Sequence, residues 1–184
     1  DLPLGEHGAL EIEASEGRKQ VRILRVHLEE DAGKLAHAEG GVNASEVDLN
    51  RTGTPLLEIV SEPDIHSVEE ARAYCTGLRQ LVTYLGVSEA NMQMGHMRFE
   101  PNINLRITED GRSEATPIVE LKNLNSFRAV ERAVEFEQRR QLVEWEDRRI
   151  TLAQGGKTTR GWNDDTGETF VQREKEEAHD YRYF

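Results

Sequence analysis

Hydrophobic and polar residues alternate over much of the early part of the chain, which is the pattern of β-strands with one buried face. Val21, Ile23 and Val26 are β-favouring residues set among polar neighbours, and they mark the clearest strand. A segment containing Gly53 and Pro55 suits a turn rather than a helix. The strands predicted in this part cover residues 9–15, 20–31, 46–49 and 56–60.

An amphipathic helix follows, and its start is recognisable. Ser67 and Glu70 form a capping box, in which the Ser hydroxyl accepts a bond from a free backbone N–H and the Glu reaches back to the cap. Gly86 can adopt the positive φ that ends such a helix. The predicted apolar stripe comprises Val68, Ala71, Cys75, Leu78, Leu81, Val82 and Leu85.

A second, longer helix is predicted nearer the end of the chain. Asn125 or Ser126 caps it, and residues that favour helix continue through about Leu152. Gly155 and Gly156 are expected to terminate it.

Glycine-containing turns predict two β-hairpins in the same part of the chain. The turns are Asp110–Gly111 and Asp165–Gly167, where positive φ is easily adopted. They join strands predicted at 97–108 with 116–122, and at 158–163 with 168–173. Strands joined by hairpins, with two inserted helices, predict an α+β fold with a mainly antiparallel sheet rather than a doubly wound α/β fold. No clear internal domain boundary is visible.

Composition narrows the classes of partner. The 184 residues include 23 Lys+Arg against 35 Asp+Glu, a net charge of -12, so the chain by itself is expected to bind DNA or RNA poorly. The single cysteine, Cys75, excludes an internal disulfide and is expected to be buried. No apolar run reaches the roughly 20 residues that cross a bilayer, which predicts a protein of the cytoplasm or an organelle matrix, without a membrane anchor. No glycine-rich phosphate loop is present.

The densest group of chemically active side chains is His27-Leu28-Glu29-Glu30-Asp31, at the end of a predicted strand. Alternation places His27, Glu29 and Asp31 on one face at intervals of about 6 to 7 Å. Carboxylates suit Mg²⁺, and a histidine can join them or hold a water. The alternative is a solvated acidic strand end.

Three further groups combine charge with hydrogen-bonding capacity. Arg98, Glu100, Asn102 and Asn104 share one face of a predicted strand, which is either a functional face or a plain amphipathic strand. The segment 122–127 leads into a helix start, where free N–H groups attract phosphate unless a cap uses them. The segment 175–184 is rich in Tyr and Arg and suits a partner interface or a structural hydrogen-bond cluster.

Taken together, these motifs resemble the family of aspartyl/glutamyl-tRNA amidotransferase B subunits. The resemblance covers nearly everything after about residue 20, and its blocks occur in the family's order. The blocks are His27–Lys34, Val47–Arg51, Pro55–Asp64, Leu85–Ser88, Met97–Arg98, Lys122–Phe127, Thr159–Arg160 before Trp162, and Lys175–Phe184.

The resemblance implies a glutamine-synthetase-like α+β catalytic domain that uses ATP and Mg²⁺. Such a protein phosphorylates the side-chain carboxylate of Glu-tRNA(Gln) or Asp-tRNA(Asn), and ammonia then displaces the phosphate. Its partners are the amidase, or A, subunit, which releases the ammonia, and the small C subunit. The family's N-terminal acid-and-histidine strand and its helical C-terminal domains are expected to lie outside this chain, so the chain alone is expected to be inactive.

The resemblance also implies roles for individual residues. The catalytic group is His27, Glu29, Glu30, Asp31 and Arg98, and the metal ligands are His27, Glu30 and Glu100, with Glu30 the strongest prediction. Nucleotide binding falls to Lys122, Asn123, Asn125 and Ser126. The chain departs from the family at Glu100-Pro101, because the family usually has Asp followed by a small residue there. Two competing hypotheses are a non-catalytic scaffold that docks the amidase and channels ammonia, and an unrelated Mg²⁺- or Ca²⁺-binding module.

Overall fold

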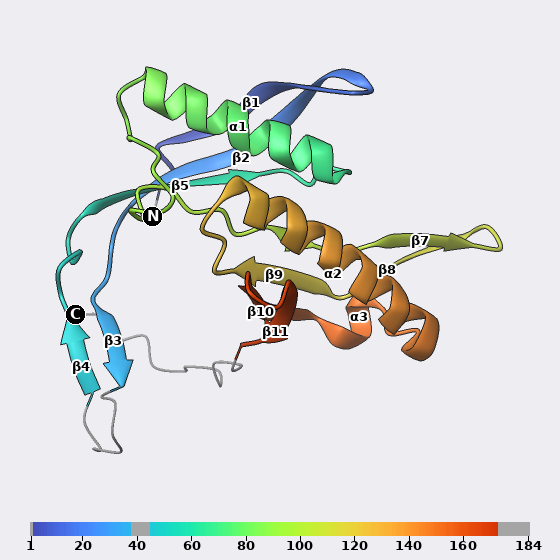
Figure 1. Cartoon of the computed structure of the whole chain (residues 1–184). Coiled ribbons are helices and arrows are strands. Elements are labelled where there is room, and N and C mark those ends of the chain that lie inside the picture. Colours follow the sequence, from blue (N-terminus) through green and yellow to red (C-terminus); the bar gives the residue numbers. More distant parts are fainter. Residues whose placement is uncertain (1, 38–44, 173–184) are drawn as a thin grey trace. The chain divides into compact units, whose positions relative to one another are not determined.

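The computed structural model describes residues 2–37 and 45–172, and these form two compact units that divide between His66 and Ser67 (Figure 1). Both units contain antiparallel β-sheet, and the helices lie in the second. This mixture confirms the predicted α+β class. Among the residues described, no helix is both long enough and apolar enough to span a bilayer.

The first unit is built on a three-stranded antiparallel sheet of order β1-β2-β5. Its strands are β1 Gly5–Ala14, β2 Gly17–Glu30 and β5 Pro55–Ser61. Ile12 and Val21 are buried in it, and a register shift between Ile23 and Arg25 bulges β2. A separate ribbon pairs β3, Lys34–His37, with β4, Ser45–Asp48. The four strands predicted here are thus confirmed.

The second unit contains a four-stranded sheet of order β11-β10-β9-β6. The strands are β6 Asn102–Ile103, β9 Ile118–Lys122, β10 Lys157–Asn163 and β11 Glu168–Val171. β9 and β10 run parallel, whereas the other neighbours are antiparallel. The parallel pair was not predicted, and it arises because the long helix between these strands carries the chain back across the sheet.

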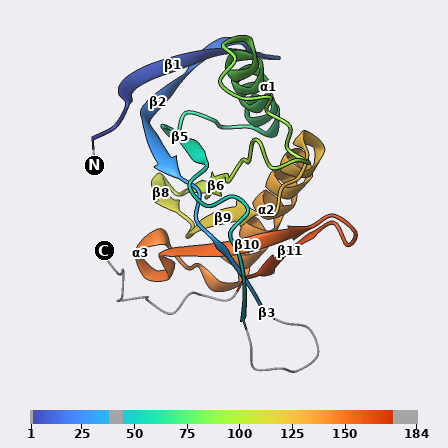
Figure 2. The ribbon, with the colours of Figure 1, turned by 90° about the vertical axis from the view of Figure 1, so that its left-hand side faces the viewer.

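Among its described residues, three helices and a small hairpin complete this unit. The helices are α1 Val68–Tyr84, α2 Phe127–Arg148 and the short α3 Leu152–Gly155. Ser67 caps α1 by accepting from the Glu70 N–H at 3.1 Å, as predicted. The hairpin of β7, Arg106–Glu109, and β8, Arg112–Ala115, extends away from the sheet around the predicted Asp110–Gly111 turn (Figure 1). α2 lies across one face of the sheet, above the β10–β11 hairpin in Figure 2.

Several predicted boundaries are wrong in detail. The segment 97–108 is mostly irregular, with two short strands, because β6 pairs only briefly with β9. α2 ends at Arg148, where Arg149 itself adopts a left-handed conformation with φ 53°, and Gly155–Gly156 instead end α3. The buried side of α1 carries Tyr74 as well as Cys75, Leu78 and Val82, whereas Leu81 and Leu85 are exposed.

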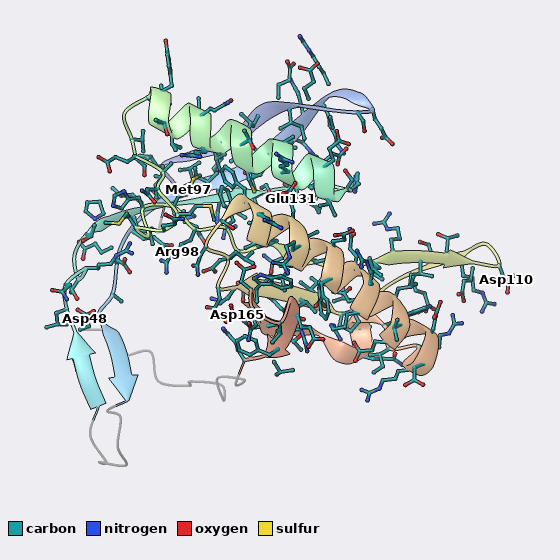
Figure 3. The ribbon with its side chains drawn as sticks, in the orientation of Figure 1. Asp48, Met97, Arg98, Asp110, Glu131 and Asp165 are labelled. Carbon is teal, nitrogen blue, oxygen red and sulfur yellow. The ribbon has the colours of Figure 1, made fainter. Side chains whose placement is uncertain are left out.

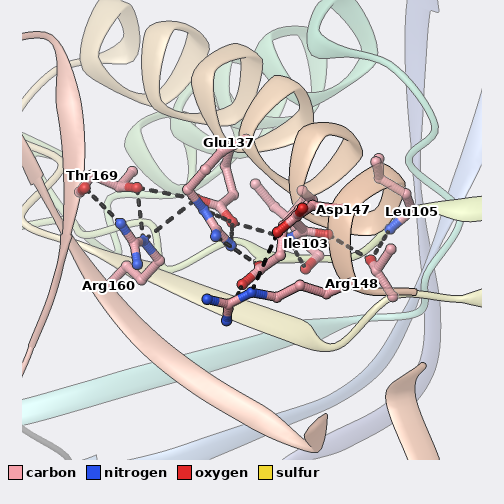
Figure 4. Close-up of polar contacts among 11 residues, drawn as sticks. Ile103, Leu105, Glu137, Asp147, Arg148, Arg160 and Thr169 are labelled. Atoms are coloured by element: carbon pink, nitrogen blue, oxygen red, sulfur yellow. Dashed lines mark hydrogen bonds and ion pairs between the residues drawn. The ribbon is translucent and has the colours of Figure 1, made fainter. Parts of the chain in front are cut away.

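A buried polar network joins α2 to the inner side of the sheet (Figure 4). Glu137 is fully buried and accepts hydrogen bonds from Arg140, Gln141 and Thr169. Arg160 on β10 donates to both the hydroxyl and the carbonyl of Thr169, at 2.8 and 2.7 Å, and its Nε lies 3.7 Å from Glu137. Val119 and Leu121 of β9 lie on this same inner side and are buried. The network therefore fixes β10 and β11 under α2.

Candidate functional site: the polar face of the second unit's sheet

The opposite side of the four-stranded sheet carries a face of mostly polar residues, which we call the polar sheet face. It is defined by Glu100, Asn102, Glu120, Lys122, Lys157, Thr159, Gly161, Phe170 and Gln172. Each strand contributes alternate residues to it, because successive side chains of a strand point to opposite sides. The polar sheet face thus combines segments that lie up to 72 positions apart in the chain.

The strand register aligns these residues in two rows across the sheet. In one row, Lys122 of β9 is paired with Gly161 of β10, and Gly161 with Phe170 of β11. Glu100 joins this row just before β6, and its carboxylate lies 3.3 Å from the Lys122 ammonium. The row therefore runs from an acid through a base to an aromatic ring.

The second row centres on Glu120, whose side chain is 20% exposed. Asn102 of β6 and Thr159 of β10 are its cross-strand partners. The Thr159 hydroxyl donates to Glu120 at 3.1 Å, and the Lys157 ammonium lies 3.6 Å from the other carboxylate oxygen. Gln172 continues this row through a 3.2 Å bond from its N–H to the Thr159 carbonyl.

The two ion pairs on this face are easily broken. The side chains of Glu100 and Lys122 are 42% and 38% exposed, and that of Lys157 is 51% exposed. Solvent-exposed pairs of this kind contribute about 0–1 kcal/mol. A ligand that carries both a cation and an anion can therefore replace these ion pairs at little cost. Its cation would bind the carboxylates, and its anion would bind the lysines.

The predicted nucleotide-binding residues lie at the edge of the polar sheet face. Lys122 ends β9, and Asn123 follows with φ 63°, which turns the chain toward α2. Ser126 is the N-cap of α2 and accepts from the Ala129 N–H at 3.0 Å, which confirms the capping interpretation. Asn125 is exposed between them. The nucleotide role of these four residues stays a prediction.

The other predicted group lies at the end of β2, in the first unit. The register places His27 opposite Glu58 and Glu29 opposite Leu56, so His27 and Glu29 share a face as predicted. Glu30 falls on the other face with Leu28, and both Glu29 and Glu30 are exposed. Asp31 is held by Arg51, whose Nε lies 2.8 Å from its carboxylate, and this pair closes the turn before β5.

No group of three or more His, Cys, Asp or Glu side chains gathers at metal-binding distance within residues 2–37 and 45–172. The metal role of His27, Glu30 and Glu100 thus stays a prediction. Arg98 is exposed in the segment before β6 and is labelled with Met97 in Figure 3. The segment 175–184 lies outside the described residues.

Sequence reasoning missed the part played by Glu120, Gly161, Phe170 and Gln172. Glu120 had a usable signal, because it alternates with Lys122 on a correctly predicted strand. The others had none, since their place beside Lys122 depends on the parallel pairing of β9 with β10.

Comparison with known proteins identifies the family. The B subunit of the aspartyl/glutamyl-tRNA(Asn/Gln) amidotransferase of Rhodopirellula baltica is 54% identical over 187 aligned residues, and its counterpart from Borrelia garinii is 52% identical over 184. Each alignment covers all of this chain but only 38% of the relative's length. All of residues 1–184 match the GatB/GatE catalytic domain family. The chain therefore belongs to the GatB/GatE catalytic domain family.

Proposed function

We propose that the chain forms part of the catalytic region of the B subunit in a tRNA amidotransferase. The reaction would convert Glu-tRNA(Gln) to Gln-tRNA(Gln), or Asp-tRNA(Asn) to Asn-tRNA(Asn), in the cytoplasm or an organelle matrix. Family membership and the names of the relatives support the overall reaction. A glutamine-synthetase-like architecture for the complete domain belongs to the same proposal.

The chemistry requires activation of a carboxylate. A side-chain carboxylate oxygen attacks the γ-phosphorus of ATP, and the bond to ADP breaks. Ammonia then attacks the acyl carbon, and phosphate leaves with the bonding electrons. The protein's part is to hold the phosphates, neutralise their charge and exclude water from the acyl phosphate.

The polar sheet face is the observation that supports this reaction best. Lys122 and Lys157 supply positive charge for phosphate, and the oxygen atoms of Glu100, Asn102 and Glu120 form a donor set of the kind that Mg²⁺ prefers. A bound Mg²⁺ would neutralise phosphate charge during transfer. The roles predicted for His27, Glu29 and Glu30, which lie in the first unit, belong to the same proposal.

The partners are part of the proposal. The relatives' designation as the B subunit indicates a complex with other proteins, and we propose that these are the amidase, or A, subunit, together with the small C subunit. The net charge of -12 indicates that this chain contributes little to tRNA affinity by itself.

The experiment is amidation of misacylated tRNA by the complete amidotransferase with ammonium as the nitrogen donor, which bypasses the amidase. Lys122→Met and Glu120→Gln are expected to lower the rate on the order of 100-fold, since each removes charge stabilisation around the transferring phosphoryl group. Glu109→Gln is the matched control, because Glu109 is an exposed acid on the β7–β8 hairpin, paired with Arg149. Glu30→Gln tests the first unit in the same assay.

Two outcomes would refute the proposal. Full amidation activity in both Lys122→Met and Glu120→Gln would show that the polar sheet face has no role in the reaction. Failure of the complete protein to bind either Mg²⁺ or ATP would instead favour a scaffold that docks the amidase and channels ammonia.

A further inference from the structure

Phe170 is the aromatic side chain of the polar sheet face, and it is 46% exposed. It lies on β11, which is an edge strand of the sheet. Burying a phenylalanine is worth about 1.5–3 kcal/mol, so leaving the ring in solvent forgoes much of that stabilisation. The exposed side of this ring is therefore available to a ligand.

Gly161 allows the ring to lie directly on the sheet. A Cβ at this position would come 2.5 Å from Cζ of Phe170 and 2.9 Å from both Nδ2 of Asn123 and Nε2 of Gln172. Any side chain other than glycine would therefore have to displace the ring. Three side chains from two segments, the end of β9 and β11 with its continuation, meet above this one residue.

The chemistry of these three side chains fits a planar, hydrogen-bonding ring. An aromatic side chain binds the face of a nucleobase, and such stacking contributes about 1–3 kcal/mol per base. Carboxamides such as those of Asn123 and Gln172 pair with the N6 amino group and N7 of adenine.

The position of Lys122 completes the match to a nucleotide. Lys122 and Phe170 lie in the same row with only β10 between their strands, so their backbones are about 10 Å apart, twice the usual strand spacing. An extended nucleoside triphosphate spans this separation between its base and its terminal phosphates. The ring and the ammonium thus suit the two ends of one molecule.

We propose that Phe170, with Asn123 and Gln172, binds the adenine ring of the ATP whose phosphates lie at Lys122. The inference rests on the proposed function, because that function supplies ATP as the ligand. The inference adds to that function the position of the nucleobase and the preference of the site for adenine. The 3′-terminal adenosine of a tRNA carries the same ring, and the experiment distinguishes the two sources.

The experiment measures equilibrium binding to the complete protein by calorimetry at saturating Mg²⁺. The ligands are ATP, inorganic tripolyphosphate and a short RNA ending in adenosine. Phe170→Ala is expected to weaken ATP on the order of 5- to 100-fold and to leave tripolyphosphate unchanged. Phe170→Tyr should bind ATP like the wild type. Val171→Ala, an exposed neighbour on the opposite side of β11, is the matched control.

Each result that would contradict the adenine site leads to a different conclusion. Unchanged ATP affinity in Phe170→Ala, or wild-type affinity for tripolyphosphate equal to that for ATP, would overturn the adenine site while leaving the phosphate site intact. A loss confined to the RNA ligand would assign the ring to the tRNA end instead. If the complete protein bound neither ATP nor tripolyphosphate, the proposed function would be overturned together with this inference.

Discussion

Replacing Glu137 with alanine tests whether the network under α2 holds the second unit together. Glu137 is fully buried, and Arg140 donates to both its carboxylate oxygens through Nε at 3.0 Å and to Oε1 through Nη2 at 2.7 Å. Gln141 and Thr169 each add a bond at 3.1 Å. Arg160 contributes a second guanidinium at 3.7 Å. Removing the carboxylate leaves two partly buried arginines without their shared counter-ion.

The expected loss is about 3–5 kcal/mol in the free energy of unfolding, the usual cost of deleting one partner of a buried ion pair. Burial by itself lowers the pKa of the Arg140 guanidinium, but Glu137 and Glu144 together raise it above the ordinary value. In Glu137→Ala, Arg140 keeps its charge in the same partly buried position with one carboxylate fewer, which costs free energy. Total stabilities of domains are about 5–15 kcal/mol, so this loss is a large part of the whole.

Glu135 provides the control on the same helix. It pairs with Arg139 at 2.6 Å, which is shorter than the closest contact of Glu137, but the two side chains are 55% and 71% exposed. An exposed pair at this spacing contributes about 0.3–0.5 kcal/mol. The comparison therefore separates burial from distance as the source of stability.

Urea denaturation of the two variants, followed by circular dichroism, measures both losses. We expect a large decrease in the urea midpoint for Glu137→Ala and almost none for Glu135→Ala. Similar losses in the two variants would refute this expectation, because the energy would then follow the distance between the charges rather than their burial. A double variant with Arg160→Leu should lose less than the sum of the two single changes.

Three further predictions concern single side chains. Burial raises the pKa of the Cys75 thiol to about 12, so Ellman's reagent at pH 8 should leave it unmodified until the protein is denatured; rapid labelling of the native protein would contradict this. Arg22 donates to both carboxylate oxygens of Asp64 and holds the pKa of that carboxyl well below its usual range. The stabilisation from this pair is therefore complete above the ordinary carboxyl pKa, and it is lost as the pH falls through the lower pKa of the folded protein. Asp64→Asn should therefore lower the melting temperature at pH 7, with the difference from the wild type shrinking in acid, and a difference independent of pH would exclude the pair as its cause. Ser126→Ala should lose about 1 kcal/mol in urea denaturation because the α2 cap is removed, whereas Ser126→Asp should retain most of it.

Local signals explain what the sequence predicted correctly. Ser67 and Glu70 define a helix start within four residues, and Asp110–Gly111 defines a turn within two. Alternation in β2 assigned His27 and Glu29 to one face because the strand itself carries that information. Each of these features depends on neighbours in the chain, so one sequence is enough to find it.

Features that depend on distant segments could not be predicted in the same way. α2 ends at Arg148 although a glycine pair lies a few residues further on: Arg149 adopts the αL conformation, and it pairs with Glu109 of the distant β7–β8 hairpin. The parallel pairing of β9 with β10 requires α2 to cross the sheet. Without that pairing, nothing in the sequence places Gly161 beside Lys122.

The two sides of β10 link the buried network to the proposed site. Arg160 points to the inner side and is bonded to Thr169, which in turn donates to Glu137, while Thr159 and Gly161 point to the polar sheet face. A slip of one residue between β10 and β11 would exchange these sides and separate Phe170 from Gly161. The cost of moving Arg160 out of its bonds opposes that slip. The ion-paired network therefore favours the register that pairs Phe170 with Gly161, and weakening it should disturb the proposed nucleotide binding without any direct contact to the ligand.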